Sequence, residues 1–187
     1  MDRQAEAIRE IKRAQELDPL SLIIASAVGR VYHFAGQYDQ ALEEYRKTLE
    51  MDANYGEAHF NLGFTYAKKG MYGEAIAELQ EAIKLSENRT VMLAVLGHFY
   101  SMAGKQTQAR SVLEQLNELS NRCYVSPLDM AIVYTGLGEK EPTFEWFEKA
   151  YQERAGALIY LKVEALYDSL RSEPRFNDLL RRMNLAL

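Results

Sequence analysis

The chain has 187 residues, of which 48% are hydrophobic and 26% are charged, and these are ordinary values for a soluble folded protein. Its 22 lysines and arginines against 27 acidic residues give a formal net charge of −5, which argues against a domain that binds nucleic acid through its phosphates. The single cysteine, Cys123, excludes an intramolecular disulfide and a zinc site built from cysteines.

The sequence shows no segment that would place the protein in a membrane. Its longest uninterrupted apolar run, 91–96, is far too short to cross a bilayer. The N-terminal residues contain no hydrophobic segment of a signal peptide. We therefore expect a cytoplasmic protein without membrane contact.

Glycine, tyrosine and alanine recur along the chain with a period of 34 residues. The glycine column is Gly36, Gly70, Gly104 and Gly138, and the tyrosine column is Tyr32, Tyr66, Tyr100 and Tyr134. A second glycine column is Gly29, Gly63 and Gly97, followed by Ala131, and an alanine column is Ala7, Ala41, Ala75 and Ala109, followed by Thr143. Several columns with one period identify a repeat protein.

The first predicted element, 2–17, fits the second helix of a unit whose first helix is absent. Either the chain begins inside a longer array, or this helix serves as an N-terminal cap. Its apolar face carries Ala7, Ile11 and Ala14, and the next unit covers only part of that face. We expect either a homodimer through this N-terminal edge or a frayed helix, because a helix of this length is marginal without packing.

Each full unit is predicted to be a helix, a tight turn and an antiparallel second helix, such as the one over 38–51. Gly36 stands in the turn, where glycine can adopt the left-handed conformation that ends a helix. Gly29 lies inside the first helix, where it allows the partner helix to approach closely. The apolar face of each unit needs a neighbouring unit to bury it.

The end of the array departs from the regular pattern. Ser126 is predicted to cap a first helix that starts at Pro127, two or three residues late. Cys123, in the linker before it, is interpreted as a small linker residue rather than as a reactive thiol. After Ala155 the period stops, and a final helix near Pro174, capped by Ser172, should help to cover the last apolar face.

These columns resemble the tetratricopeptide repeat family over roughly the first 155 residues. The resemblance implies an all-α fold, a right-handed superhelical solenoid of antiparallel helix pairs with a helical C-terminal cap. It implies one domain over 1–187, divided into a half repeat (1–19), four repeats (22–55, 56–89, 90–123 and 124–157) and capping helices (158–187). The tail also resembles the segment that follows such repeats in bacterial regulatory proteins.

The chemistry of a catalytic site is missing from the sequence. The three histidines, His33, His59 and His98, include no pair with the spacing that binds zinc from one helix. The acidic pairs are expected to lie on solvated helix faces. The glycine clusters belong to the repeat columns and do not indicate a phosphate-binding loop. We expect no catalysis, cofactor or metal. RNA-binding helical arrays need a basic groove, which this sequence does not supply.

The family resemblance implies instead a protein or peptide partner bound in a groove lined by the first helix of each unit. The implied groove residues are Ile23, Ser26, Arg30, His33, Glu57, Phe60, Phe64, Ala67, Val91, Ala94, His98 and Ser101. Phe60 and Phe64 are the preferred anchors for a partner segment. In the fourth unit, Val125, Leu128 and Ile132 are expected to lie in the core of the stack or under the C-terminal tail. The alternative function is a structural or self-association module of a larger bacterial signalling or transcription regulator.

Overall fold

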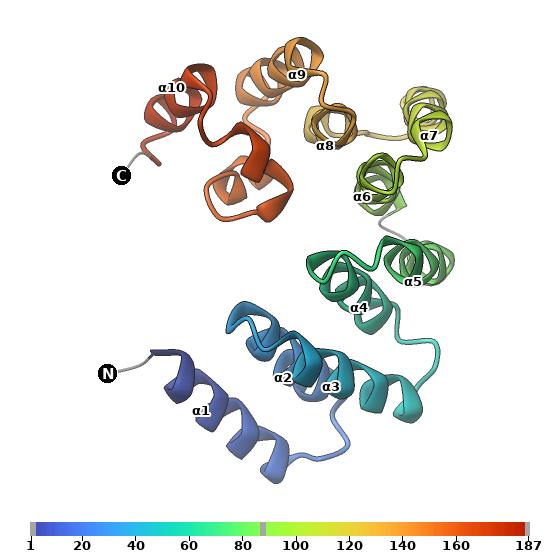
Figure 1. The fold of residues 1–187 in the computed structure, drawn as a ribbon, viewed down its shortest axis with the longest axis vertical. Coiled ribbons are helices and arrows are strands. Elements are labelled where there is room, and N and C mark those ends of the chain that lie inside the picture. The colour runs from blue at the N-terminus through green and yellow to red at the C-terminus, as the bar shows by residue number, and fades with distance from the viewer. Residues whose placement is uncertain (1–2, 87–88, 186–187) are drawn as a thin grey trace. The chain divides into compact units, whose positions relative to one another are not determined.

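The computed structural model describes residues 3–86 and 89–185, and every regular element in these ranges is a helix (Figure 1). The chain divides into two compact units, residues 1–87 and 88–187. The first contains α1 (Arg3–Leu17), α2 (Leu22–Phe34), α3 (Tyr38–Met51), α4 (Gly56–Lys68) and α5 (Tyr72–Leu85). The second contains α6 (Arg89–Met102), α7 (Gln106–Leu119), α8 (Pro127–Leu137), α9 (Lys140–Gln152), the short 3-10 helices η1 (Gly156–Tyr160) and η2 (Ala165–Leu170), and α10 (Pro174–Arg182).

Successive helices pack as pairs within each unit. In the first unit α2 packs on α3 and α4 on α5, and in the second unit α6 packs on α7 and α8 on α9 (Figure 1). The predicted all-α fold of helix-pair repeats is confirmed. Among the described residues, none of the helices combines the length and the apolar character that a membrane span requires.

The turn inside each pair ends at the glycine that the sequence predicted. Gly36 has φ +74°, and Gly70, Gly104 and Gly138 have φ between +73° and +75°. The Gly36 N–H donates to the carbonyl of His33, and the next N–H, of Gln37, donates to the carbonyl of Tyr32. These bonds satisfy carbonyls at the end of α2 and turn the chain into α3.

The glycines inside the first helices of the first two repeats lie at close helix contacts. A Cβ atom added to Gly63 would lie 3.1 Å from the carbonyl oxygen of Ala75 and 3.3 Å from Cδ1 of Leu79, both on α5. At Gly29 it would lie 2.6 Å from the Tyr45 ring of α3. The predicted close approach of the two helices is confirmed, because an added Cβ atom at either glycine would lie closer to the partner helix than ordinary van der Waals contact.

Two predicted helix boundaries in the regular part are also confirmed. The second helix of the first repeat spans Tyr38–Met51. α8 begins at Pro127, and the Ser126 hydroxyl accepts a hydrogen bond from the N–H of Leu128 at 3.3 Å. The late start follows from the serine cap and from proline, which favours the first helical position.

The C-terminal tail forms a helix where predicted but with a different cap. α10 begins at Pro174, and its N-cap residue is Glu173, so the prediction of Ser172 is wrong. The N–H of Glu173 still donates to the carbonyl of Leu170 at 2.9 Å, which keeps Ser172 inside the turn after η2.

An aromatic cluster attaches the tail to α9. The ring of Phe147, on α9, lies 5.4 Å from the Tyr167 ring of η2 and 6.0 Å from the Phe176 ring of α10, measured between centroids. Phe147, Tyr167 and Phe176 are all buried. The tail therefore covers apolar surface that α9 would otherwise expose to water.

Candidate protein-binding faces

The predicted groove residues of α2 differ in their access to solvent. Ile23 is 71% exposed and Arg30 is exposed, whereas His33 is half-buried. Ser26 is 1% exposed, and its hydroxyl has no hydrogen-bond partner among the described residues. Ile23, Arg30 and His33 can therefore contact a partner, and Ser26 cannot do so in this structure.

The predicted residues of α4 remain accessible beside those of α2. Glu57 is exposed, and Phe60, Phe64 and Ala67 are half-buried. The Phe60 and Phe64 rings meet edge to face, with centroids 4.9 Å apart. The Arg30 guanidinium lies 3.3 Å from the Glu57 carboxylate, so an ion pair joins the two helices on this side.

We call this surface, with Ile23, Arg30, Phe34, Glu57, Phe60 and Phe64, the α2–α4 face. Phe34 was missed by the sequence analysis, although it is 75% exposed. Its signal was available, because Phe34 follows Ile23 by eleven residues, or about three helical turns, and so shares its side of the helix. The face combines aromatic and aliphatic side chains with one ion pair.

His33 lies between α2 and α4. Its Nδ1 atom is 2.9 Å from the hydroxyl oxygen of Thr65, on α4. Burial lowers the pKa of His33, and the nearby positive charge of Lys68 lowers it further. The imidazole therefore favours its neutral form and serves as a hydrogen-bonding group between the two helices.

In the second unit, most of the predicted groove residues lie inside the protein. Val91 is 39% exposed, but Ala94, His98 and Ser101 are buried. The cause is the close approach of α8, because a Cβ atom on Gly136 would lie 2.8 Å from Cα of His98. His98 is held there by its Nδ1 atom, 3.2 Å from the carbonyl oxygen of Ile132.

Two of the three residues expected to lie in the core or under the tail are buried. Leu128 and Ile132 are buried on α8, which packs against η2, while Val125 is half-buried before the helix begins. This prediction is confirmed for Leu128 and Ile132. α8 thus serves the core of its unit rather than a partner-binding surface.

His59 contributes to packing inside the second repeat. Its Nδ1 atom is 2.6 Å from the Glu78 carboxylate of α5, and its Nε2 atom is 3.0 Å from the carbonyl oxygen of Ala53. Among the described residues, no group of three histidine, cysteine, aspartate or glutamate side chains is arranged to hold a metal ion.

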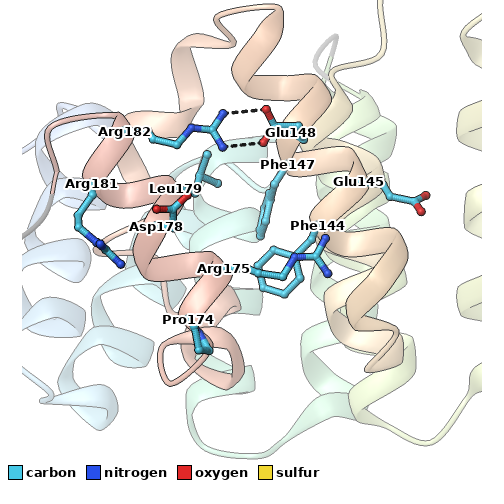
Figure 2. Close-up of a pocket in the computed structure, with 10 residues that line it drawn as sticks. All are labelled: Phe144, Glu145, Phe147, Glu148, Pro174, Arg175, Asp178, Leu179, Arg181 and Arg182. Atoms are coloured by element: carbon cyan, nitrogen blue, oxygen red, sulfur yellow. Dashed lines mark hydrogen bonds and ion pairs between the residues drawn. The ribbon is translucent and has the colours of Figure 1, made fainter.

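An open pocket of about 730 Å³ lies between α9 and α10 in the second unit (Figure 2). Its lining is Phe144, Glu145, Phe147, Glu148, Pro174, Arg175, Asp178, Leu179, Arg181 and Arg182. Ion pairs cross it, because Arg182 contacts both oxygens of Glu148, at 2.9 and 2.7 Å. The guanidinium of Arg175 lies 4.5 Å from the centroid of the Phe144 ring. Three arginines face three carboxylates, so the pocket selects neither an anion nor a cation by net charge.

Comparison with known families finds matches to the regular part of the chain. One family model, described as TPR repeat, matches residues 29–70, and a second, described as Tetratricopeptide repeat, matches residues 56–89. The chain contains tetratricopeptide repeats. The matched residues include α3, α4 and α5 and the last six residues of α2. Of the α2–α4 face, only Ile23 lies outside the matched residues.

Solved structures of other tetratricopeptide repeat proteins share the fold. A crystal structure of MamA matches with a TM-score of 0.57 at 24% identity, over 82% of this chain and 90% of that one. YrrB, described as a TPR protein with an unusual peptide-binding site, matches with a TM-score of 0.54 at 18% identity, over 92% and 89% of the chains. A tetratricopeptide repeat protein of Parabacteroides merdae matches with a TM-score of 0.60 at 17% identity, over 97% and 68%. No curated protein sequence matches the chain.

Proposed function

We propose that this protein is a non-catalytic scaffold that binds a peptide or helix of a partner protein on the α2–α4 face. The observation that supports the proposal is the set of accessible apolar side chains on two neighbouring helices, in repeats of a family of protein-interaction scaffolds. A soluble domain usually hides such a patch unless something binds to it. The peptide-binding site named for the structurally similar YrrB agrees with this use of the fold.

The face favours a partner segment with apolar side chains and few charges. Phe60 and Phe64 offer ring edges and faces on which an aliphatic or aromatic side chain can pack. Arg30 and Glu57 neutralise each other, so the face does not select a charged partner by itself. Of the predicted groove residues, the proposal depends on Ile23, Arg30, Glu57, Phe60 and Phe64.

Replacing both rings, Phe60→Ala with Phe64→Ala, should weaken partner binding at least tenfold, equivalent to about 1.4 kcal/mol. The partner is first captured from extract on the immobilised full chain and identified, and its affinity is then measured by calorimetry. Ile159→Ala with Tyr160→Ala is the matched control, because these side chains are 59% and 54% exposed in the other unit. An unchanged affinity in the phenylalanine variant, with helix content preserved, would remove the α2–α4 face as the binding site.

The N-terminal edge supports self-association as a second candidate function. α1 has no buried residue among those described, and Leu17 at its end and Leu20 beyond it are 80% and 81% exposed. Of the predicted edge residues, Ala7 is exposed and Ile11 and Ala14 are half-buried. Two copies that met at this edge would cover these apolar side chains. Such self-association is the alternative function, that of a module within a larger bacterial regulator.

A further inference from the structure

One side of α2 carries large apolar side chains at both of its ends. Ile23, Ala27, Arg30 and Phe34 recur at helical spacing, so they form one stripe. Ile23 is 71% and Phe34 is 75% exposed, although each belongs to a helix that is otherwise well packed. We call these four residues the α2 stripe.

In the next repeat, the positions that correspond to the two ends of the stripe carry charged side chains. One period after Ile23 and Phe34, the chain carries Glu57 and Lys68, and both of these charged side chains are exposed. The same two columns thus hold charges in the second repeat and large hydrophobic side chains in the first. Exposure to water accounts for Glu57 and Lys68, but not for Ile23 and Phe34.

The α2 stripe is complementary to a reversed copy of itself. In an antiparallel pair of α2 helices centred between residues 28 and 29, each Ile23 meets the Phe34 of the other copy. The small Ala27 then lies beside Arg30 at the centre and leaves room for its long side chain. The charge of Arg30 is already balanced by Glu57, so two arginines can approach without an unpaired charge.

The exposed charges of α1, which packs beside α2, show the same self-complementarity. The helix has seven exposed charged residues, and all of them except Lys12 pair by sign around a midpoint between residues 9 and 10. In an antiparallel pair of α1 helices, the opposed charges are Arg3 with Glu16, Glu6 with Arg13, and Arg9 with Glu10.

We propose that two copies of this chain associate through antiparallel α2 helices, with Ile23 of each copy packed on Phe34 of the other and with the α1 charges opposed. The proposal rests on the proposed self-association at the N-terminal edge and specifies its interface and orientation. A pair of short helices buries less surface than a permanent dimer, so the dimer is reversible and its population depends on concentration.

Disulfide trapping tests the orientation. In a Cys123→Ser background, Ile23→Cys and Phe34→Cys chains are prepared separately, then oxidised alone and as an equal mixture. The antiparallel arrangement predicts a disulfide-linked dimer in the mixture and almost none in either chain alone, because identical positions lie about 16 Å apart along the helix axis. Equal cross-linking in all three samples, or none in the mixture, would overturn the proposal.

Light scattering over a range of concentrations tests the interface itself. The native chain should show a rising average mass, and Phe34→Glu should raise the dissociation constant at least tenfold. Val163→Glu is the matched control, since Val163 is 71% exposed in the other unit, and it should leave the mass unchanged. A native chain that stays monomeric, or an unchanged Phe34→Glu dimer, contradicts the proposal. Phe60→Ala with Phe64→Ala changes no residue of the α2 stripe and should leave the dimer intact, so this variant tests partner binding apart from self-association. The two surfaces share Ile23, Arg30 and Phe34, so a bound partner should compete with the dimer.

Discussion

Gly63 lies at a close contact between α4 and α5, and the space around it decides which residues are tolerated there. The nearest atom is the Ala75 carbonyl oxygen, which belongs to the backbone and cannot rotate away as a side chain can. Gly73, on the exposed side of α5, has no atom within 4 Å of an added Cβ. Two glycines on neighbouring helices thus have opposite requirements.

Gly63→Leu should therefore lower the free energy of unfolding by about 1–3 kcal/mol, the range typical of overpacking. Gly73→Ala should leave it unchanged or raise it by up to about 1 kcal/mol, since alanine favours a helix more than glycine does. Urea denaturation followed by circular dichroism measures both. A Gly63→Leu protein as stable as the native one would show that α4 and α5 are not in close contact at this residue.

The burial of His98 makes the stability of the protein depend on pH. Burial lowers its pKa, while its hydrogen bond to the Ile132 carbonyl partly offsets that effect. The folded protein therefore releases the His98 proton more readily than the unfolded chain, whose histidine keeps the ordinary pKa of about 6.5. The contribution of His98 to the free energy of unfolding is fully present above the pKa of the unfolded chain. It is lost as the pH falls through the lower pKa of the folded protein.

Acidification from pH 7.5 to pH 5.0 should thus lower the urea midpoint of the native protein, and His98→Asn should reduce this loss. Asparagine can still donate a hydrogen bond to the Ile132 carbonyl but does not titrate. Buried Asp129 acts in the opposite direction at lower pH, because burial raises its pKa and so favours folding in acid. If His98→Asn loses as much stability as the native protein over this interval, His98 does not titrate with folding.

At the scale of the element, α10 is attached by two kinds of contact that differ in strength. Phe176 is fully buried against Phe147 and Tyr167, whereas the Arg182–Glu148 pair lies at the surface beside the pocket (Figure 2). Burial of an aromatic ring contributes several kcal/mol, and exposed ion pairs contribute little. The aromatic contact should dominate.

Phe176→Ala should destabilise the second unit by about 3–5 kcal/mol, the usual cost of removing a buried aromatic ring. Arg182→Ala should have a much smaller effect on urea denaturation, and Tyr160→Ala, at a 54% exposed position, provides a neutral comparison. The reverse order of effects, with Arg182 more important than Phe176, would assign the attachment of α10 to its ion pairs.

The sequence predicted the elements better than it predicted their surfaces. The period and the capping residues located α3 and the start of α8, since both signals are local. The same helical spacing placed Ser26, Ala94, His98 and Ser101 on one stripe with Phe60, yet these four are buried. What covers His98 is α8, and its approach depends on Gly136, which lies 38 residues away in the chain. Spacing within one helix carries no information about such a neighbour.

For the whole molecule, burial differs greatly between helices. α1 has no buried residue among those described, while most of α8 is buried, including Leu128, Ile132 and Val133. A helix with few buried contacts opens at little cost, and helices in the core open only with global unfolding. The chain should therefore differ in local stability from one helix to another.

Hydrogen exchange followed by mass spectrometry should show this order. At a concentration low enough to avoid association, backbone amides of α1 should exchange orders of magnitude faster than those of α8. Addition of protein should slow exchange in α1 and α2 if the chain self-associates, while α8 serves as an internal reference. Equal protection of α1 and α8 in the dilute sample would contradict the burial-based order.

The positive φ of the four turn glycines determines whether an L- or a D-amino acid fits each turn. Gly36, Gly70, Gly104 and Gly138 have φ between +73° and +75°, and an added Cβ would meet no atom within 4 Å. The obstacle to a side chain at these positions is thus the chirality of natural amino acids rather than a lack of space. A D-amino acid favours positive φ, so a mirror-image residue, introduced by chemical synthesis, is compatible with these turns where its natural counterpart is strained.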